Sequence, residues 1–204
     1  GILSQPIAEE LCEKGFDAES LEGGYIGWLT EKMQNLNITE NVEKSLRKKF
    51  KKSIWCKFTK AINEYKLVNP NDKIAVCISG GKDSMLMAKL FQELKRHDKF
   101  PFEVEYLVMN PGYSPANLEI IKNNAKSMSI PIHIFESDIF NSVFNIEKNP
   151  CYICARMRRG YLYSKARELG CNKIALGHHF DDVIETILMG MLYGGQVQTM
   201  MPKL

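Results

Sequence analysis

The chain has 204 residues, of which 45% are hydrophobic and 10% aromatic, so we expect one domain with an appendage and a hydrophobic core of ordinary size. No stretch approaches the roughly 20 consecutive apolar residues of a membrane helix, and the first residues lack the pattern of a signal sequence. We therefore expect a globular protein of the cytoplasm with no membrane partner. The six cysteines lie in a large lysine-rich chain, which favours reduced thiols or metal ligands over disulfides.

The formal net charge of +3 conceals two segments of opposite sign. Residues 1–43 carry nine acidic side chains and two lysines, a balance of −7, whereas residues 44–60 carry eight basic side chains and no acidic one. A change of this size indicates a boundary near residue 40. We predict a short α-rich extension and linker over residues 1–40, followed by one domain over residues 41–204.

The N-terminal extension begins with a predicted short helix from Ala8 to Gly15. Residues 16–21 then lead into the segment Leu21-Glu22-Gly23-Gly24, with Trp28 after three further residues. This pattern resembles the carboxyl end of rhodanese domains, in which a final strand leads into a similar segment. The resemblance implies a truncated rhodanese-like remnant, with residues 1–4 as the tail of a persulfide-forming loop. An unrelated helical extension is the alternative.

Residues 41–65 are predicted to form one amphipathic helix. Leu46, Phe50, Ile54 and Phe58 recur on one face, and the lysines largely occupy the others. The basic face is either a solvated helix surface or a contact surface for RNA phosphates, and the charge alone leaves both interpretations open. The candidate RNA contacts in this segment are Lys48, Lys49 and Lys52.

Short aliphatic segments alternate with helical patterns from residue 73 onwards. The predicted strands are 73–78, 103–109, 132–135 and 173–176, and the predicted helices are 84–96, 115–128, 154–169 and 180–192. This alternation implies right-handed crossovers and a parallel sheet covered on both faces, so the predicted class is doubly wound α/β. Ligands in this class bind outside the carboxyl ends of the strands. Met109, at the end of the second strand, is therefore a candidate nucleotide contact.

A hexapeptide with the chemistry of a phosphate-binding loop follows the first of these strands. Its residues are Ser79, Gly80, Gly81, Lys82, Asp83 and Ser84, and the next helix is predicted to start at Ser84. Glycines let backbone amides approach phosphate oxygens, the serine hydroxyls add donors, and a helix amino terminus offers unpaired N–H groups. Lys82 supplies a positive charge, and Asp83 either caps the helix or holds Mg²⁺. A plain Gly-Gly turn is the alternative, and the spacing disfavours a Walker-type loop.

The hexapeptide S-G-G-K-D-S resembles the motif of the PP-loop ATP pyrophosphatases. Members of that family cleave ATP between its α and β phosphates and typically attach AMP to a carbonyl oxygen. The resemblance implies ATP and Mg²⁺ as cofactors, a catalytic role for Lys82, and a loop that surrounds the leaving pyrophosphate. Fixed donors and a cation suit the negative charge that develops on such a leaving group.

A second polar segment follows the last predicted strand and is expected at the same edge of the sheet. It runs Gly177-His178-His179-Phe180-Asp181-Asp182. Gly177 lets the chain turn beside the nucleotide, and Asp182 is a candidate catalytic residue that orients Mg²⁺ or the substrate. The alternative is an ordinary turn in which Asp181 or Asp182 caps the following helix. A metal site on the paired histidines is disfavoured, since adjacent side chains diverge and no third histidine is suitably spaced.

Cys151 and Cys154 form a C-x-x-C pair at the start of a predicted helix and are followed by several arginines. A helix amino terminus and neighbouring arginines make an electropositive setting that favours thiolates as metal ligands or nucleophiles. Taken alone, the pair is compatible with a zinc half-site, a dithiol, an iron–sulfur site or chance. The other cysteines are predicted to be structural, Cys77 because it lies inside an apolar strand.

The stretch from Cys151 to Leu204 resembles the tRNA 2-thiocytidine synthetase family. The matching motifs are C-Y-I-C-A-R-M-R-R-G-Y-L-Y, A-L-G-H-H-F-D-D-V-I-E-T, M-L-Y-G-G and M-P-K-L. With the phosphate loop, the resemblance covers about residues 45–204. It implies that Cys151 and Cys154 are catalytic and hold a [4Fe–4S] cluster with a third cysteine, which in the family lies beyond the M-P-K-L segment. Either this chain is truncated, or the cluster chemistry is absent.

The resemblance implies an ATP-dependent tRNA sulfurtransferase that adenylates the C2 oxygen of an anticodon-loop cytidine and releases AMP and pyrophosphate. Its candidate tRNA contacts are Arg156, Arg158 and Arg159, with plain surface charges as the alternative, and Tyr152 or Tyr161 is a candidate to stack on a displaced base. Expected partners are tRNA, a sulfur donor such as a persulfide-carrying protein and, as an open alternative, a second copy of the chain. The rival functions are uridine thiolation by a related PP-loop enzyme and a non-catalytic RNA-binding module with a structural zinc.

Overall fold

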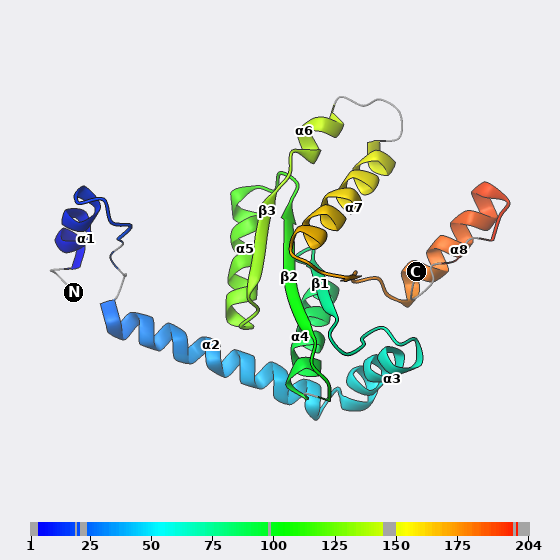
Figure 1. The fold of residues 1–204 in the computed structure, drawn as a ribbon, viewed down its shortest axis with the longest axis horizontal. Helices are drawn as coiled ribbons and strands as arrows, with labels where there is room; N and C mark the ends of the chain where they lie inside the picture. The colour runs from blue at the N-terminus through cyan, green and yellow to red at the C-terminus, as the bar shows by residue number, and fades with distance from the viewer. Residues whose placement is uncertain are drawn as a thin grey trace.

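The computed structural model describes residues 4–18, 20, 24–97, 99–144, 150–197 and 199. A parallel sheet forms the centre of the molecule, with helices around it (Figure 1). Within the described residues, no helix is long and apolar enough to cross a membrane. The sequence expectations for residues 1–3, 21–23 and the M-P-K-L segment at 201–204 concern residues outside the described ones.

All four predicted strands are present and pair in parallel. They are β1 (Lys73–Ile78), β2 (Glu103–Asn110), β3 (Ile132–Glu136) and β4 (Lys173–Ala175). In the order β3-β2-β1-β4, the chain adds β2 and then β3 on one side of β1. It then returns and adds β4 on the other side of β1. The strand order therefore reverses between β1 and β4, which is where doubly wound folds bind ligands.

Both faces of the sheet are covered. The helices of this part are α4 (Lys82–Arg96), α5 (Pro115–Ser127), α6 (Ile139–Phe144), α7 (Pro150–Glu168) and α8 (Phe180–Gly194). Val76 and Ile78 of β1 pack into a core shared with α4 and α5, whereas Ala75 packs with Ala166 of α7 on the other face. This alternation is the two-residue period of a strand, and the predicted doubly wound α/β class is confirmed.

Two helices begin earlier than the sequence predicts, and both starts carry candidate site residues. α4 begins at Lys82 rather than Ser84, and α7 begins at Pro150 rather than Cys154. The prediction relies on apolar periodicity, and the polar first turn of a helix carries none of it. Lys82 and Cys151 therefore belong to first helical turns, and Cys154 begins the second turn of α7.

The prediction of one helix over residues 41–65 is wrong. This segment and the one before it form α2 (Gly24–Arg47), a turn, a π-helical stretch (Lys51–Trp55) and α3 (Cys56–Glu64). After α2, the backbone hydrogen bonds span five residues instead of the four of an α-helix. The Phe50 amide, for example, donates to the Ser45 carbonyl at 2.9 Å.

The N-terminal extension is helical, as the predicted α-rich character requires. α1 (Ser4–Glu13) begins before the predicted Ala8, and α2 then crosses residue 40 without a break. The domain boundary near residue 40 and the rhodanese-like remnant stay predictions.

Candidate nucleotide and sulfur site

The phosphate loop connects β1 to α4 and is shaped from within by the Ser84 hydroxyl. This hydroxyl accepts a hydrogen bond from the Ser79 amide at 3.2 Å and donates one to the Gly81 carbonyl at 2.9 Å. The Ser79 and Ser84 hydroxyls also lie within hydrogen-bond distance, at 3.2 Å. Ser84 is buried, whereas Gly81 is the N-cap residue of α4, so the unpaired amides of the first turn border the loop.

The position of Gly80 requires glycine for two reasons. Its φ of +89° lies in a region that side chains rarely adopt. A β-carbon there would also lie 2.7 Å from Cγ1 of Ile121 on α5. The backbone of the phosphate loop therefore packs directly on α5, and this close approach fixes the shape of the loop.

Lys82 and Asp83 open α4 next to the loop. Lys82 and Ser79 are exposed and Asp83 is half-buried. Within the described part of the chain, no acidic group lies within ion-pair distance of the Lys82 ammonium. A free cation, unpaired helix amides and a carboxylate are thus combined at one helix start, which suits a polyphosphate that carries Mg²⁺.

The segment after β4 lies against the phosphate loop. A β-carbon added to Gly177 would lie 3.4 Å from both the backbone nitrogen and the Cα of Ser84. The predicted convergence of the two segments at one edge of the sheet is therefore confirmed. They flank the switch point between β1 and β4, which is the expected position of a bound nucleotide.

Asp182 takes the capping role that the sequence left open as its alternative. Its carboxylate accepts a hydrogen bond from the backbone amide of His179, the residue before α8, at 2.7 Å. The His179 ring lies 3.6 Å from the same carboxylate oxygen. A further role of Asp182 toward Mg²⁺ or the substrate stays a prediction. In the described residues, no three His, Cys, Asp or Glu side chains are grouped closely enough to hold one metal ion.

Cys151 and Cys154 differ in their surroundings although both lie within the first five residues of α7. Cys151 is exposed, whereas Cys154 is half-buried and packs against the core cluster of Met109, Ile139 and Val143. The side chain of Met109 is only 4% exposed because it belongs to this cluster. A nucleotide contact at Met109 would therefore be made by its main chain.

The packing of Cys154 places the C-x-x-C pair at the phosphate-loop end of the sheet. Met109 follows Val108, which pairs with Ile78, and the phosphate loop begins at the next residue, Ser79. Backbones of neighbouring strands lie about 4.8 Å apart. The cluster against which Cys154 packs therefore includes the residue of β2 that lies beside the first residue of the phosphate loop.

One face of α7 carries an exposed stripe of aromatic and basic side chains, called here the α7 stripe. Tyr152, Arg156, Arg159 and Tyr163 follow at spacings of four, three and four residues, which places them on one face of the helix, and all are exposed. Arg158 is half-buried. No acidic side chain among the described residues lies within ion-pair distance of these arginines. The stripe starts beside Cys151 and has the composition of a single-stranded nucleic-acid contact.

The lysines predicted to contact RNA lie at the other end of the sheet. Trp55, in the π-helical stretch that includes Lys52, stacks on His97 with ring centroids 5.1 Å apart. His97 is the C-cap residue of α4, whose first turn borders the phosphate loop. The structure thus brings the phosphate loop and Gly177 together, packs Cys154 against a cluster that includes the neighbouring end of β2, and leaves Lys48, Lys49 and Lys52 apart from them.

Sequence reasoning missed Asn110 and Glu136, which end β2 and β3. The Asn110 amide donates to Glu136 at 2.7 Å, and its carbonyl oxygen accepts from the Tyr113 amide at 2.7 Å. These bonds hold the turn that follows β2 at the same edge as the phosphate loop. The rule that site residues follow strands points to Asn110, but an asparagine before Pro111 and Gly112 is equally typical of a turn.

Cys77, inside β1, and Cys171, just before β4, have a packing role. Cys77 is 7% exposed inside β1, and burial raises the pKa of its thiol to about 12. Cys171 packs against the cluster of Ala75, Leu107 and Ala166, and burial raises the pKa of its thiol as well. Both therefore stay protonated at neutral pH, in agreement with their predicted structural role.

Known proteins resemble this chain in the same region. The model of the PP-loop domain family matches residues 46–202. The tRNA-cytidine(32) 2-sulfurtransferase of Neisseria meningitidis is 39% identical over 150 residues, which are 71% of this chain and 46% of that protein. The tRNA-cytidine(32) 2-sulfurtransferase 2 of Francisella tularensis subsp. holarctica is 37% identical over 175 residues, which are 82% of this chain and 64% of that protein. The chain thus spans less than two thirds of the length of either relative.

A solved structure shares the fold. The U34-tRNA thiolase NcsA from Methanococcus maripaludis with its [4Fe-4S] cluster matches with a TM-score of 0.57 and 25% identity, over 70% of this chain and 51% of that one. The family match at residues 46–202 includes the phosphate loop, the C-x-x-C pair and the segment after β4. The chain therefore belongs to the PP-loop domain family.

Proposed function

We propose that this protein transfers sulfur to C2 of a cytidine in the anticodon loop of tRNA, at the expense of ATP. The observation that carries the proposal is that Cys154 packs against the cluster of Met109, Ile139 and Val143, in which Met109 lies beside the start of the phosphate loop. A nucleotide-activating loop and a thiol pair at one sheet edge are what a coupled activation and sulfur-transfer reaction requires. The names of the Neisseria and Francisella relatives support cytidine as the target.

The activation step uses the residues at the switch point. The cytidine C2 oxygen attacks the α-phosphorus of ATP, the bond to the bridging oxygen breaks, and pyrophosphate leaves. Lys82 and the first-turn amides of α4 stabilise the charge on the leaving pyrophosphate. Asp83, half-buried next to them, would hold Mg²⁺ on the phosphates, and Asp182 is a second candidate ligand that also caps α8.

The second step replaces the activated oxygen with sulfur. A sulfur nucleophile at the sulfide oxidation level attacks C2, and AMP leaves with the former C2 oxygen. We assign Cys151 and Cys154 as two ligands of a [4Fe–4S] cluster, which when bound would supply an iron site that can carry the sulfide. The exposed position of Cys151 in a first helical turn fits a cluster ligand. Such a cluster needs at least one further ligand besides this pair.

The α7 stripe is the proposed contact for the anticodon loop. Tyr152 and Tyr163 are 61% and 49% exposed and present aromatic faces on which bases stack, and Arg156 and Arg159 contact phosphates. Because the stripe begins next to Cys151, an RNA loop bound along it would have a base within reach of the thiol pair. Arg158 and the lysines at positions 48, 49 and 52 complete the proposed RNA contacts.

The test is pyrophosphate release from ATP in the presence of Mg²⁺ and unmodified tRNA. The wild-type protein is expected to release pyrophosphate in a tRNA-dependent manner, and Lys82→Ala should lower the rate by about 100-fold or more. Lys122→Ala, an exposed lysine on α5, serves as the matched control and should leave the rate unchanged. Release of phosphate instead of pyrophosphate, or an unaffected Lys82→Ala variant, would contradict the proposal.

Uridine thiolation is the second candidate, since the structurally similar NcsA is a U34-tRNA thiolase. It would use the same activation chemistry, so the identity of the thiolated nucleotide separates the two. A persulfide-carrying sulfur donor, a second copy of the chain and a cytoplasmic location remain predictions from the sequence.

A further inference from the structure

A second basic surface lies away from the site described above. It consists of the exposed lysines Lys44, Lys48, Lys49, Lys51, Lys52, Lys57 and Lys60, and is called here the basic surface. Within the described residues, no acidic group lies within ion-pair distance of any of these seven ammonium groups. A merely solvated helix face normally mixes both signs of charge. Unpaired charge of one sign at this density indicates a polyanionic partner.

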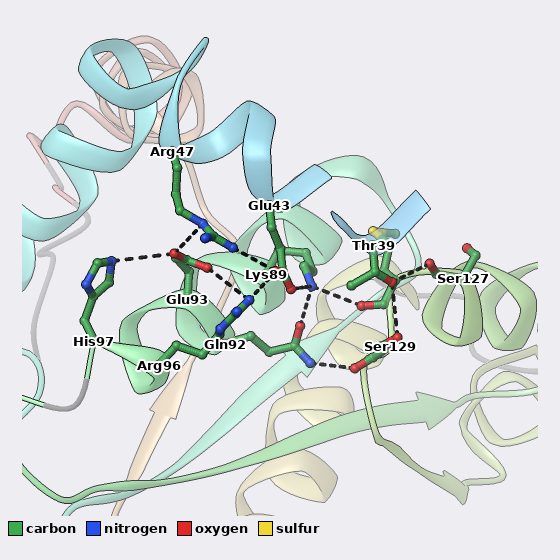
Figure 2. A network of polar contacts seen from close by, with 11 residues as sticks. Thr39, Glu43, Arg47, Lys89, Gln92, Glu93, Arg96, His97, Ser127 and Ser129 are labelled. Atoms are coloured by element: carbon green, nitrogen blue, oxygen red, sulfur yellow. Dashed lines mark hydrogen bonds and ion pairs between the residues drawn. The ribbon is translucent and has the colours of Figure 1, made fainter. Parts of the chain in front are cut away.

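Two acidic residues beside the basic surface, Glu43 and Glu93, are already neutralised, whereas the exposed Glu40 lines a hollow together with Lys44 and Lys48. Glu43 of α2 accepts hydrogen bonds from Arg96 and from the buried Lys89, the latter at 3.3 Å, and Glu93 pairs with Arg47 at 3.0 Å (Figure 2). Burial alone would raise the pKa of Glu43, but its bonds to Arg96 and Lys89 lower it. These acids therefore compensate the cations of the network, and the seven lysines keep their full charge toward solvent.

The same network fixes the basic surface to α4. Lys89 is 2% exposed and also donates to the Met128 carbonyl at 3.1 Å, while Thr39 of α2 donates to the Ser127 carbonyl at 3.0 Å (Figure 2). On the α3 side, Phe58 packs edge-on against Phe91 of α4 with ring centroids 5.5 Å apart. Trp55 and Phe58 thus pack inward, whereas Phe50 is 37% exposed and lies beneath the Lys49 ammonium, 5.2 Å from its ring centroid.

The basic surface is remote from the phosphate loop. α4 has 15 residues and begins at that loop, whereas its end at Arg96 joins the network beneath the basic surface. At 1.5 Å per residue this helix spans roughly 20 Å. One RNA nucleotide cannot occupy both places, so a tRNA whose target base lies at the switch point would present another part of itself to these lysines.

We infer that the basic surface binds the phosphate backbone of a helical arm of tRNA, outside the loop that carries the target nucleotide; this inference rests on the proposed function. The seven exposed lysines outnumber the exposed aromatic rings of this region, Phe50 and Tyr65, which suits phosphates rather than bases. The α7 stripe holds the loop, and the basic surface holds the body of the same molecule. Recognition of the whole tRNA thus depends on two contacts at opposite ends of α4.

The test measures the affinity of the full chain for two RNAs in the absence of ATP. One RNA is the whole tRNA, and the other is a minimal hairpin that keeps the target loop and only the base pairs next to it. Lys48→Ala combined with Lys52→Ala should weaken whole-tRNA binding about tenfold and reduce the slope of log affinity against log salt by about two. The same variant should bind the hairpin as tightly as the wild type does.

Two controls separate charge from folding and position. Lys48→Arg combined with Lys52→Arg keeps the charge and should restore whole-tRNA binding, while Lys14→Ala with Lys122→Ala removes two exposed lysines elsewhere and should change nothing. Equal losses for both RNAs, or no loss for either, would overturn the inference. Because binding is measured without ATP, the binding result can be interpreted even if the proposed thiolation chemistry fails.

Discussion

Single residues set the geometry of the nucleotide site. Gly80 lets the loop approach α5, and Gly177 lets the segment after β4 lie against Ser84. Ser84 is a hydrogen-bonding hub inside the loop, with partners at Ser79 and Gly81. The cation and the carboxylate of the site, on Lys82 and Asp83, therefore project from a backbone whose shape is already fixed.

Replacement of Gly80 by alanine should destabilise the protein and disable the loop. The positive φ and the clash with Ile121 together should cost about 2–4 kcal/mol. Urea unfolding measures the loss, and tRNA-dependent pyrophosphate release should fall even at temperatures where the variant is folded. Gly194→Ala is the matched control, because a β-carbon there meets open space within α8. Equal stability of Gly80→Ala and the wild type would show that the loop differs from this description.

At the scale of elements, the amino ends of β1 and β4 are joined by Asp72. Its carboxylate accepts from Lys173 at 2.6 Å, from the Asn172 side chain at 2.8 Å and from the Asn69 amide at 2.6 Å. Asp72 is buried, at 6% exposure. Burial by itself raises the pKa of this carboxyl, but the bonds from Lys173, Asn172 and Asn69 lower it below the ordinary value of 3.8.

Asp72→Ala should lower the free energy of unfolding by about 2–3 kcal/mol at pH 7. A carboxyl whose pKa is lower in the folded state stabilises the protein above the unfolded-state pKa and loses this effect as pH falls through the folded-state value. The difference between wild type and variant should therefore be constant above about pH 5 and shrink below about pH 4. Urea unfolding over this pH range checks it, with the exposed Asp17→Ala as control. A difference that grows toward acid would contradict the assignment.

The elements that the sequence predicts well are those with a clear apolar period. The continuous apolar run of β1, which is buried from Ile74 to Ile78, and the periodic leucines of α4 identify strands, helices and hence the fold class. The segment around Lys48 is predicted wrongly, because a contact distant in sequence, the packing of Trp55 on His97, leaves no mark in its helical period. Contacts distant in sequence, such as Lys89 with Glu43, leave no local pattern at all. For the same reason the sequence finds the phosphate loop by its composition but not the packing of Cys154 against the cluster that contains Met109.

At the scale of the whole molecule, chemistry and anchoring lie at opposite ends of α4. The phosphate loop, the segment after β4 and the C-x-x-C pair meet at the carboxyl end of the sheet, where α7 lies in Figure 1. The basic surface lies where α2 and α3 meet the other end of α4 (Figure 1). A tRNA held at both places would have its loop over the thiol pair and a helical arm along the lysines.

The central claim is that this edge of the sheet thiolates cytidine in tRNA, and nucleoside mass spectrometry of the product tRNA tests it most directly. The protein, reconstituted with iron and sulfide under anaerobic conditions, is incubated with ATP, Mg²⁺ and unmodified tRNA. We predict 2-thiocytidine with the wild type, none with Cys151→Ser, and an unchanged amount with Cys56→Ser, an exposed cysteine near the basic surface. Thiouridine instead of thiocytidine would favour the second candidate function, and thiolation that persists in Cys151→Ser would contradict the role given to the cysteine pair.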